Sequence, residues 1–66
     1  KGDYDRAIED YTKSISIKPA ADAYYGRGVA YDKKGLSDRA IADFRQACDM
    51  GYDLGCKSSQ KTLKDR

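Results

Sequence analysis

The sequence predicts an all-α protein of about four helices, in which antiparallel helix-turn-helix units stack into a short α-solenoid. Three observations lead to this fold class. The phrase DRAIEDY at positions 5–11 returns as DRAIADF at positions 38–44. Apolar residues around both copies recur at the spacing of one helix face. Glycine or proline stands at the breaks between the segments. A chain of this length forms one domain, residues 1–66.

The repeated phrase belongs to a longer internal repeat. Shifting the chain by 33 residues aligns KGDYDRAIEDY with KGLSDRAIADF, and seven of the eleven positions are identical. A period between 20 and 50 residues is typical of stacked structural units, each unable to bury its apolar face alone. The sequence therefore predicts a core formed by stacking one unit on its copy.

Four helices are expected at residues 3–17, 21–34, 37–50 and 53–64. Asp3 and Ser37 are the predicted N-caps of the first and third helices, and Pro19 lies where the first must end. The first and third helices carry matching one-sided apolar stripes. These stripes consist of Ala7, Ile8, Tyr11 and Ile15 in the first copy, and Ala40, Ile41, Phe44, Ala47 and Cys48 in the second.

The second and fourth helices differ from the repeated pair. The second helix contains Gly26 and Gly28, which each cost about 1 kcal/mol relative to alanine in a helix interior. Glycines beside large aromatics indicate a place where another helix comes close. In the fourth segment Cys56 and Leu63 align with Ala23 and Ala30 at the 33-residue offset. The other residues of this segment are mostly polar, as expected of a helix that ends a stack.

Composition argues against several classes of function. The net charge is +2, with 13 basic and 11 acidic residues, so no basic groove for nucleic acid is indicated. No apolar run reaches the ~18 residues of a membrane span. The chain has no histidine, and no phosphate-binding glycine motif is present. We therefore expect no enzymatic activity and no cofactor, and we interpret acidic pairs such as Glu9 and Asp10 as charged helix faces.

Six residues recur in the order and spacing of a known helical repeat: Tyr24, Gly28, Tyr31, Ala40, Phe44 and Ala47. Through them the chain resembles the tetratricopeptide repeat (TPR) family over residues 1–52. Two positions depart from the family pattern, Arg27 where leucine is usual and Tyr52 where proline is usual, and the linker near Ala20 is one residue short. Arg27 is expected to weaken the helix pair locally, with its aliphatic stem lying over neighbouring tyrosines.

The resemblance implies a right-handed solenoid and a division of the chain into three parts. Residues 1–19 would be the second helix of a partial repeat, residues 20–52 a complete repeat, and residues 53–66 a C-terminal capping helix. It also implies a protein-interaction scaffold that binds a peptide or helix of a partner on its concave surface. The alternative is a face that is merely solvated, or that a neighbouring unit of a longer array covers. The concave-face residues carried over from the family are Asp22, Tyr25, Val29, Asp32 and Lys33.

Some TPR proteins hold a partner's C-terminal carboxylate with a cluster of Lys, Asn and Arg. Here Tyr25 and Val29 occupy two of those positions, which argues against that mode and favours a partly hydrophobic peptide. A different hypothesis is self-assembly through a partly uncovered apolar flank of the first helix, giving a homo-oligomer or a domain swap. The alternative is that a further helix of a longer array covers this flank. The residues of this predicted assembly face are Ile8, Tyr11, Ile15 and Ile17.

Cys48 and Cys56 bracket the segment CDMGYDLGC. An antiparallel turn between the third and fourth helices would bring them within disulfide reach, and the spacing resembles that of the cysteine-rich SEL-type repeats. A bridge implies a periplasmic or extracytoplasmic location. The alternative is two packed thiols in a cytoplasmic protein. Two cysteines without histidine do not complete a four-ligand zinc site.

Overall fold

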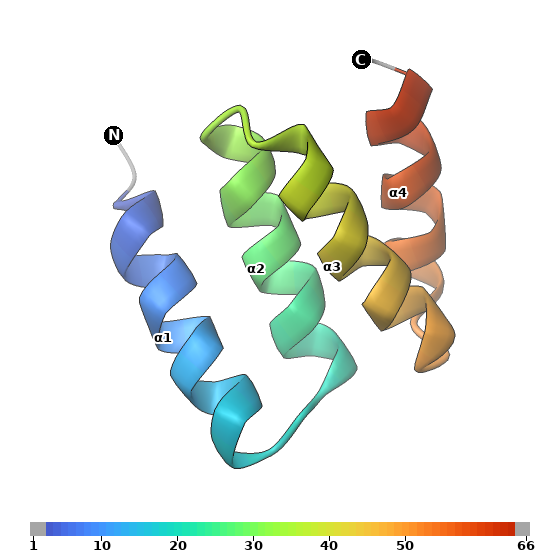
Figure 1. Ribbon diagram of the computed structural model, residues 1–66. Helices are drawn as coiled ribbons and strands as arrows, with labels where there is room; N and C mark the ends of the chain where they lie inside the picture. The colour runs from blue at the N-terminus through green and yellow to red at the C-terminus, as the bar shows by residue number, and fades with distance from the viewer. Residues whose placement is uncertain (1–2, 65–66) are drawn as a thin grey trace.

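The computed structural model describes residues 3–64 and consists of four helices in sequence (Figure 1). These are α1 (Tyr4–Ile17), α2 (Ala21–Lys33), α3 (Ser37–Asp49) and α4 (Asp53–Lys64). Each helix packs against its neighbour in the chain, and α2 also touches α4. No strand occurs within this described part. The predicted all-α solenoid is confirmed, while positions 1–2 and 65–66 of the predicted domain lie outside the described residues.

The first helix begins at a side-chain cap. The Asp3 carboxylate accepts a hydrogen bond of 3.1 Å from the backbone N–H of Arg6, as the sequence predicted. The helix ends at Ile17, and the N–H of Lys18 donates to the carbonyl of Ser14 before Pro19 interrupts the pattern. The predicted cap at Ser37 is wrong by one residue, because Ser37 is already helical and Leu36 holds the N-cap position without a side-chain bond.

A glycine turn with the same hydrogen-bond pattern follows α2 and α3. Gly35 has φ +84° and Gly51 has φ +91°, a left-handed conformation that favours glycine. After α2, the N–H of Gly35 donates to the carbonyl of Asp32 and the N–H of Leu36 to that of Tyr31. The same two bonds recur 16 residues later, from Gly51 to Cys48 and from Tyr52 to Ala47. This Schellman arrangement reverses the chain tightly, so that successive helices lie antiparallel.

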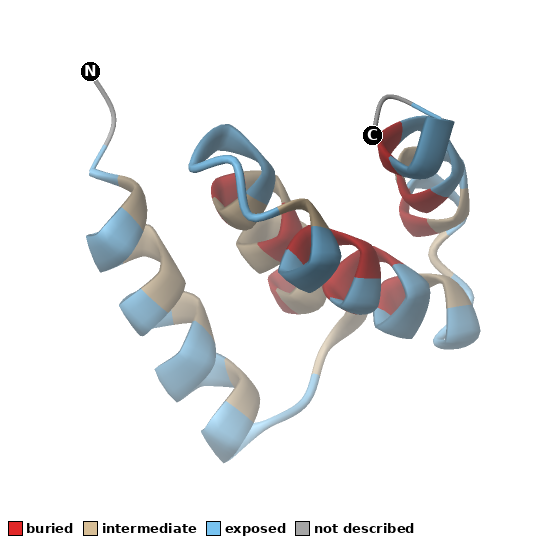
Figure 2. Cartoon of the chain, turned by 45° about the horizontal axis from the view of Figure 1, so that its top comes forward, coloured by how far each residue is buried: buried red, intermediate tan, exposed pale blue. Residues whose placement is uncertain are grey.

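The core lies between α2, α3 and α4, with α3 at its centre (Figure 2). Its largest buried side chain is that of Phe44, which is 3% exposed. No residue of α1 is fully buried, and α1 packs against α2 alone among the described helices. The buried apolar residues are Ala23, Ala30, Ala40, Ile41, Phe44 and Ala47.

Three helical glycines allow the close crossings. A Cβ on Gly26 would lie 2.4 Å from the tip of the Tyr11 ring, and one on Gly28 would lie 2.7 Å from the ring of Phe44. At Gly55 it would lie 2.6 Å from the backbone carbonyl oxygen of Phe44. The expectation that glycine marks a close helix approach therefore holds at Gly26 and Gly28, and Gly55 is a third such position.

These contacts predict an order of destabilisation for three alanine substitutions. Gly55→Ala should lower the free energy of unfolding most, by about 2–3 kcal/mol, because rigid backbone blocks the new methyl group. Gly28→Ala should cost less because an aromatic ring can shift, and Gly26→Ala least, because the tip of Tyr11 can swing away and alanine gains helix propensity. Urea unfolding followed by circular dichroism measures the order. Equal losses at all three positions would contradict this packing.

Candidate functional site

A hollow of ≈ 230 Å³ lies between α2 and α4, with α3 as its floor. Its apolar part is formed by the rings of Tyr25 and Phe44 and by Val29. Its polar part comes from both helices, with charged side chains at the exposed edge. The lining residues are Tyr25, Val29, Asp32 and Lys33 of α2, Phe44 of α3, and Ser58, Lys61 and Thr62 of α4.

Tyr25 is held in place by aromatic and polar neighbours. Its ring centroid lies 5.5 Å from that of Phe44 and 5.3 Å from that of Tyr52, in both cases with tilted planes. Tilted aromatic pairs at this distance are favourable beyond their buried area. The hydroxyl of Ser58 donates to the hydroxyl of Tyr25 at 3.5 Å. Tyr52, where the family usually has proline, therefore helps to fix one wall of the hollow.

Four of the five predicted concave-face residues line this one hollow: Tyr25, Val29, Asp32 and Lys33. Asp22 does not, because it borders a separate hollow with Tyr11, Ser14 and Ala23 between α1 and α2.

The contribution of α4 to the hollow was missed in the sequence. The 33-residue offset contained the signal, since Ser58 aligns with Tyr25 and Thr62 with Val29. Equivalent positions of successive units therefore face each other across the hollow. Phe44 was recognised in the sequence as part of a helix stripe but not as the floor of a site.

Arg27 forms a partly buried ionic network on another side of α2. Its Nε and Nη2 donate to the two carboxylate oxygens of Asp43, each at 2.8 Å, and its Nη1 donates to the hydroxyl of Thr12 at 3.2 Å. The guanidinium carbon also lies 5.5 Å from the ring centroid of Tyr24 and 5.9 Å from that of Tyr31. Arg27 thus links α1, α2 and α3 through polar contacts that the sequence did not predict.

The hydrogen bonds to Asp43 raise the pKa of Arg27 above its ordinary value, against the opposing effect of burial. A raised pKa stabilises the folded state at every pH below the ordinary value, and that contribution is lost only as the pH rises through the raised pKa. The network therefore acts as a constant structural link over the neutral range, and Arg27 and Asp43 are not part of the hollow.

The predicted assembly face is mostly turned inward. Ile8, Tyr11 and Ile15 are half-buried and share one stripe with Tyr4 and Ala7, and α2 is the described helix that this stripe packs against. Ile17 is 85% exposed at the end of α1. The remaining outer residues of α1 are polar. Self-association stays a prediction, with Ile17 as its exposed apolar residue.

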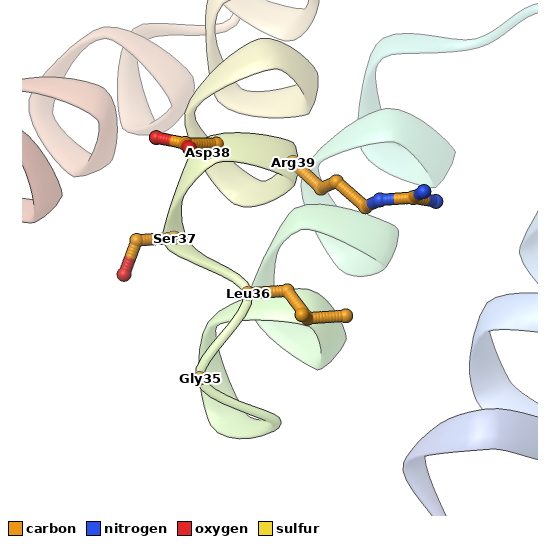
Figure 3. Close-up of a pocket in the computed structure, with 5 residues that line it drawn as sticks. All are labelled: Gly35, Leu36, Ser37, Asp38 and Arg39. Atoms are coloured by element: carbon orange, nitrogen blue, oxygen red, sulfur yellow. The ribbon is translucent and has the colours of Figure 1, made fainter.

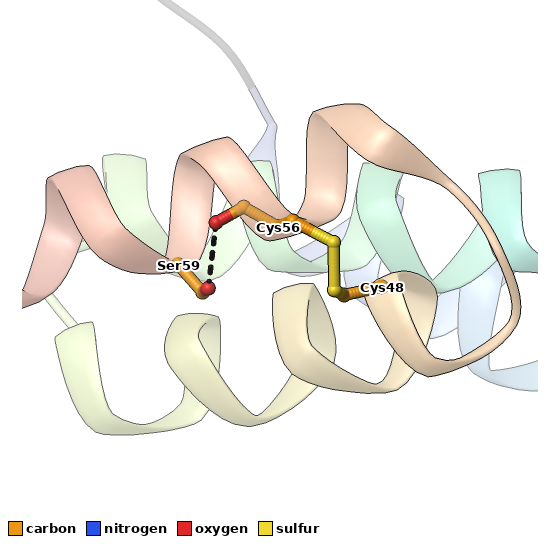
Figure 4. The surroundings of a disulfide bond; sticks show 3 residues. All are labelled: Cys48, Cys56 and Ser59. Carbon is orange, nitrogen blue, oxygen red and sulfur yellow. Dashed lines mark hydrogen bonds between the residues drawn. A yellow bond between two sulfur atoms is a disulfide. The ribbon is translucent and has the colours of Figure 1, made fainter.

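Cys48 and Cys56 form a disulfide between the end of α3 and the first turn of α4 (Figure 4). Their Cα atoms are 4.7 Å apart. The hydroxyl of Ser59 donates to the carbonyl of Cys56 at 2.9 Å, beside the bridge. Among residues 3–64, no group of His, Cys, Asp or Glu could hold a metal ion.

The hollow in Figure 3 lies at the turn between α2 and α3. Its lining residues, Gly35 to Arg39, are consecutive in the chain, so this hollow is the surface of one turn and not a cleft between elements. None of the helices described here has the length and apolar character that crossing a membrane requires.

Stacked antiparallel helices with a hollow between alternate helices define a helical repeat scaffold. A family model described as "TPR repeat" matches residues 1–35, and one described as "Tetratricopeptide repeat" matches residues 21–50. The chain belongs to the tetratricopeptide repeat family, a family of non-catalytic scaffolds that generally mediate protein–protein interaction.

Two curated relatives show the extent of the similarity. The chain is 35% identical over 49 residues to "Bacteriophage adsorption protein A" of Escherichia coli (strain K12), a match covering 74% of this chain and 5% of that protein. It is 37% identical over 54 residues to "Small glutamine-rich tetratricopeptide repeat-containing protein 2" of Mycosarcoma maydis. This match covers 80% of this chain and 15% of that protein. The chain therefore spans a small part of each relative. No solved structure matches it.

The ionic network gives a paired prediction. Asp43→Asn should lower the free energy of unfolding by about 2–3 kcal/mol, because it leaves the guanidinium of Arg27 without its charged partner in a mostly buried site. Asp10→Asn is the matched control: Asp10 is the repeat equivalent of Asp43 but is exposed on α1, so its substitution should change stability by less than about 0.5 kcal/mol. Chemical denaturation of both variants measures the difference, and equal effects would be inconsistent with a structural role for the pair.

Proposed function

We propose that this chain is a protein-interaction module that binds a peptide or helix of a partner in the hollow between α2 and α4. The observation that carries the proposal is the lining of the hollow. Exposed surface of Tyr25 and Val29 lies beside polar groups of α4, over the buried ring of Phe44. The lining is therefore mixed: Tyr25, Val29 and Phe44 offer apolar contact, and the polar side chains around them can fix the orientation of a bound segment.

The shape of the hollow favours a short segment of a partner. Two walls come from helices of different units, and the floor comes from the helix between them. A side chain of the partner would insert between Tyr25 and Thr62, and the flanking backbone would run along the exposed edge. Because Tyr25 is held by Phe44 and Tyr52, little side-chain freedom is lost on binding, which lowers the cost of association.

The charges at the edge favour an acidic group next to the inserted apolar side chain. Lys33 and Lys61 stand on opposite helices, and Asp32 is the acidic residue of the lining. The edge therefore carries one net positive charge. We expect the bound peptide to combine an aliphatic or aromatic side chain with a neighbouring carboxylate, which steers the encounter as well as adding affinity.

A matched pair of lysine variants tests this proposal. The probe is a fluorescein-labelled peptide selected from a random display library on the immobilised oxidised chain. Lys61→Glu should weaken its binding by about tenfold or more, since it reverses a charge in the hollow. Lys57→Glu makes the same change on the same helix outside the hollow, and should alter the dissociation constant by less than about twofold. Fluorescence polarisation gives both constants.

A second variant tests the apolar wall. Val29→Ala should weaken the same peptide by about fivefold, because it removes two methyl groups from the contact. Arg45→Ala, on the exposed surface of α3 outside this hollow, is its control. Thermal unfolding of each variant separates loss of binding from loss of fold. If all variants bound the peptide like the unaltered chain, or if no library peptide bound at all, this hollow would not be the interaction site.

A further inference from the structure

The fourth helix is attached to the core without burying any large apolar side chain. Its buried residues are Gly55, Ser59 and Thr62. Its two leucines are only partly covered, with Leu54 50% exposed and Leu63 41% exposed. By contrast, α3 buries Ala40, Ile41, Phe44 and Ala47. The hydrophobic contribution that holds α4 in place is therefore small for a helix of 12 residues.

The disulfide adds a covalent link to an attachment that otherwise relies on small and polar residues packed closely on α3. It joins the last turn of α3 to the first turn of α4, across a sequence separation of 8 residues. Next to it, the backbone of α4 comes closest to α3, at Gly55. In Figure 4 the bridge lies directly between the two helices. Once the bond is formed, α4 cannot move away from α3 at this end.

The two sulfurs are not sealed in the core. Cys48 and Cys56 are both half-buried, and both line an open hollow of ≈ 380 Å³ with Arg45, Gln60 and other polar residues. A small thiol in solution can therefore reach the bond. The hollow carries one positive and one negative side chain, Arg45 and Asp49, so its charge does not repel a thiolate, which is the attacking form in disulfide exchange.

The same helix supplies one wall of the candidate peptide site. Ser58 follows Cys56 by two residues and contacts the hydroxyl of Tyr25, and Lys61 and Thr62 follow one turn later. Any movement of α4 away from α3 removes this wall from the hollow. Cys56 and one wall of the peptide site thus lie on the same helix, α4, with Cys56 near its start.

We propose that the Cys48–Cys56 disulfide is a thiol-sensitive switch of the concave hollow, in which reduction releases α4 and removes peptide binding. This inference rests on the function proposed above and adds its regulation. The oxidised chain holds α4 against α3 and presents a complete hollow. The reduced chain keeps α2 and α3 packed, because they share the Arg27–Asp43 ion pair and the core around Phe44, whereas α4 detaches.

The reducing partner is a dithiol, either a small molecule or a dithiol protein. A thiolate of the dithiol attacks one cysteine sulfur, a mixed disulfide forms, and the other cysteine leaves as a thiolate and takes up a proton. The second thiol of the reductant then attacks the mixed disulfide and releases the remaining cysteine. The chain gains two electrons and two protons, and the dithiol is oxidised to its own disulfide. Oxidation by a disulfide reverses these steps.

The test combines hydrogen exchange with peptide binding on the full chain. Amide exchange of residues 57–64 should become at least tenfold faster on addition of dithiothreitol, while amides of α2 and α3 change by less than about threefold. The library-selected peptide should bind at least tenfold more weakly to the reduced chain. A Cys48→Ser/Cys56→Ser double variant should behave like the reduced chain and should not respond to dithiothreitol.

The outcomes separate the two proposals. The proposed switch is contradicted if the oxidised and reduced chains bind the peptide equally, or if amide exchange in α4 does not change on reduction. In either case the proposed peptide binding stands. If exchange rises equally in all four helices, the bridge stabilises the whole fold and is not a local switch. If the oxidised chain binds no library peptide, the proposed function fails and the switch fails with it. A response of the double variant to dithiothreitol would also overturn the assignment to this bond.

Discussion

The packing of Phe44 is the constraint on which the rest of this structure depends. Its ring lies against Gly28 of α2 and pairs with Tyr25, while its backbone carbonyl lies where a side chain on Gly55 of α4 would stand. One residue thus determines how closely α2 and α4 approach α3. The same ring forms the floor of the candidate site. Fold and site therefore share one core residue, and a change that repacks it alters both.

The repeat explains why two nearly identical segments have different roles. In α3 the phrase DRAIADF is covered on both sides, by α2 and by α4, so Ala40 and Asp43 are buried. In α1 the phrase DRAIEDY is covered by α2 alone, so the equivalent Ala7 is half-buried and Asp10 is exposed. Nearly the same residue sequence therefore forms a core helix where two helices cover it and a flanking helix where one does. Stability in such a stack comes from interfaces between units.

The sequence predicts those features of the fold that depend on residues close together in the chain. Helix boundaries, the cap at Asp3 and the close approaches at Gly26 and Gly28 all follow from periodicity, cap chemistry and glycine cost. It did not predict the partner of Arg27, because Asp43 lies 16 residues away and the pairing depends on the rotation of one helix against another. The sequence predicts a partly uncovered apolar flank at Ile8 and Ile15, and both residues are half-buried on the stripe that packs against α2. The α4 side of the hollow was readable from the 33-residue offset once equivalent positions were paired.

α2, α3 and α4 meet around Phe44, and we propose that together they form one peptide-binding hollow. A titration of the isotope-labelled, oxidised chain with a library-selected peptide, followed by amide chemical shifts in nuclear magnetic resonance, tests this directly. We expect the largest shifts on Val29, Asp32, Ser58, Lys61 and Thr62, on two helices at once. Shifts confined to α1, or to Lys57 and Lys64 on the outer face of α4, would contradict it.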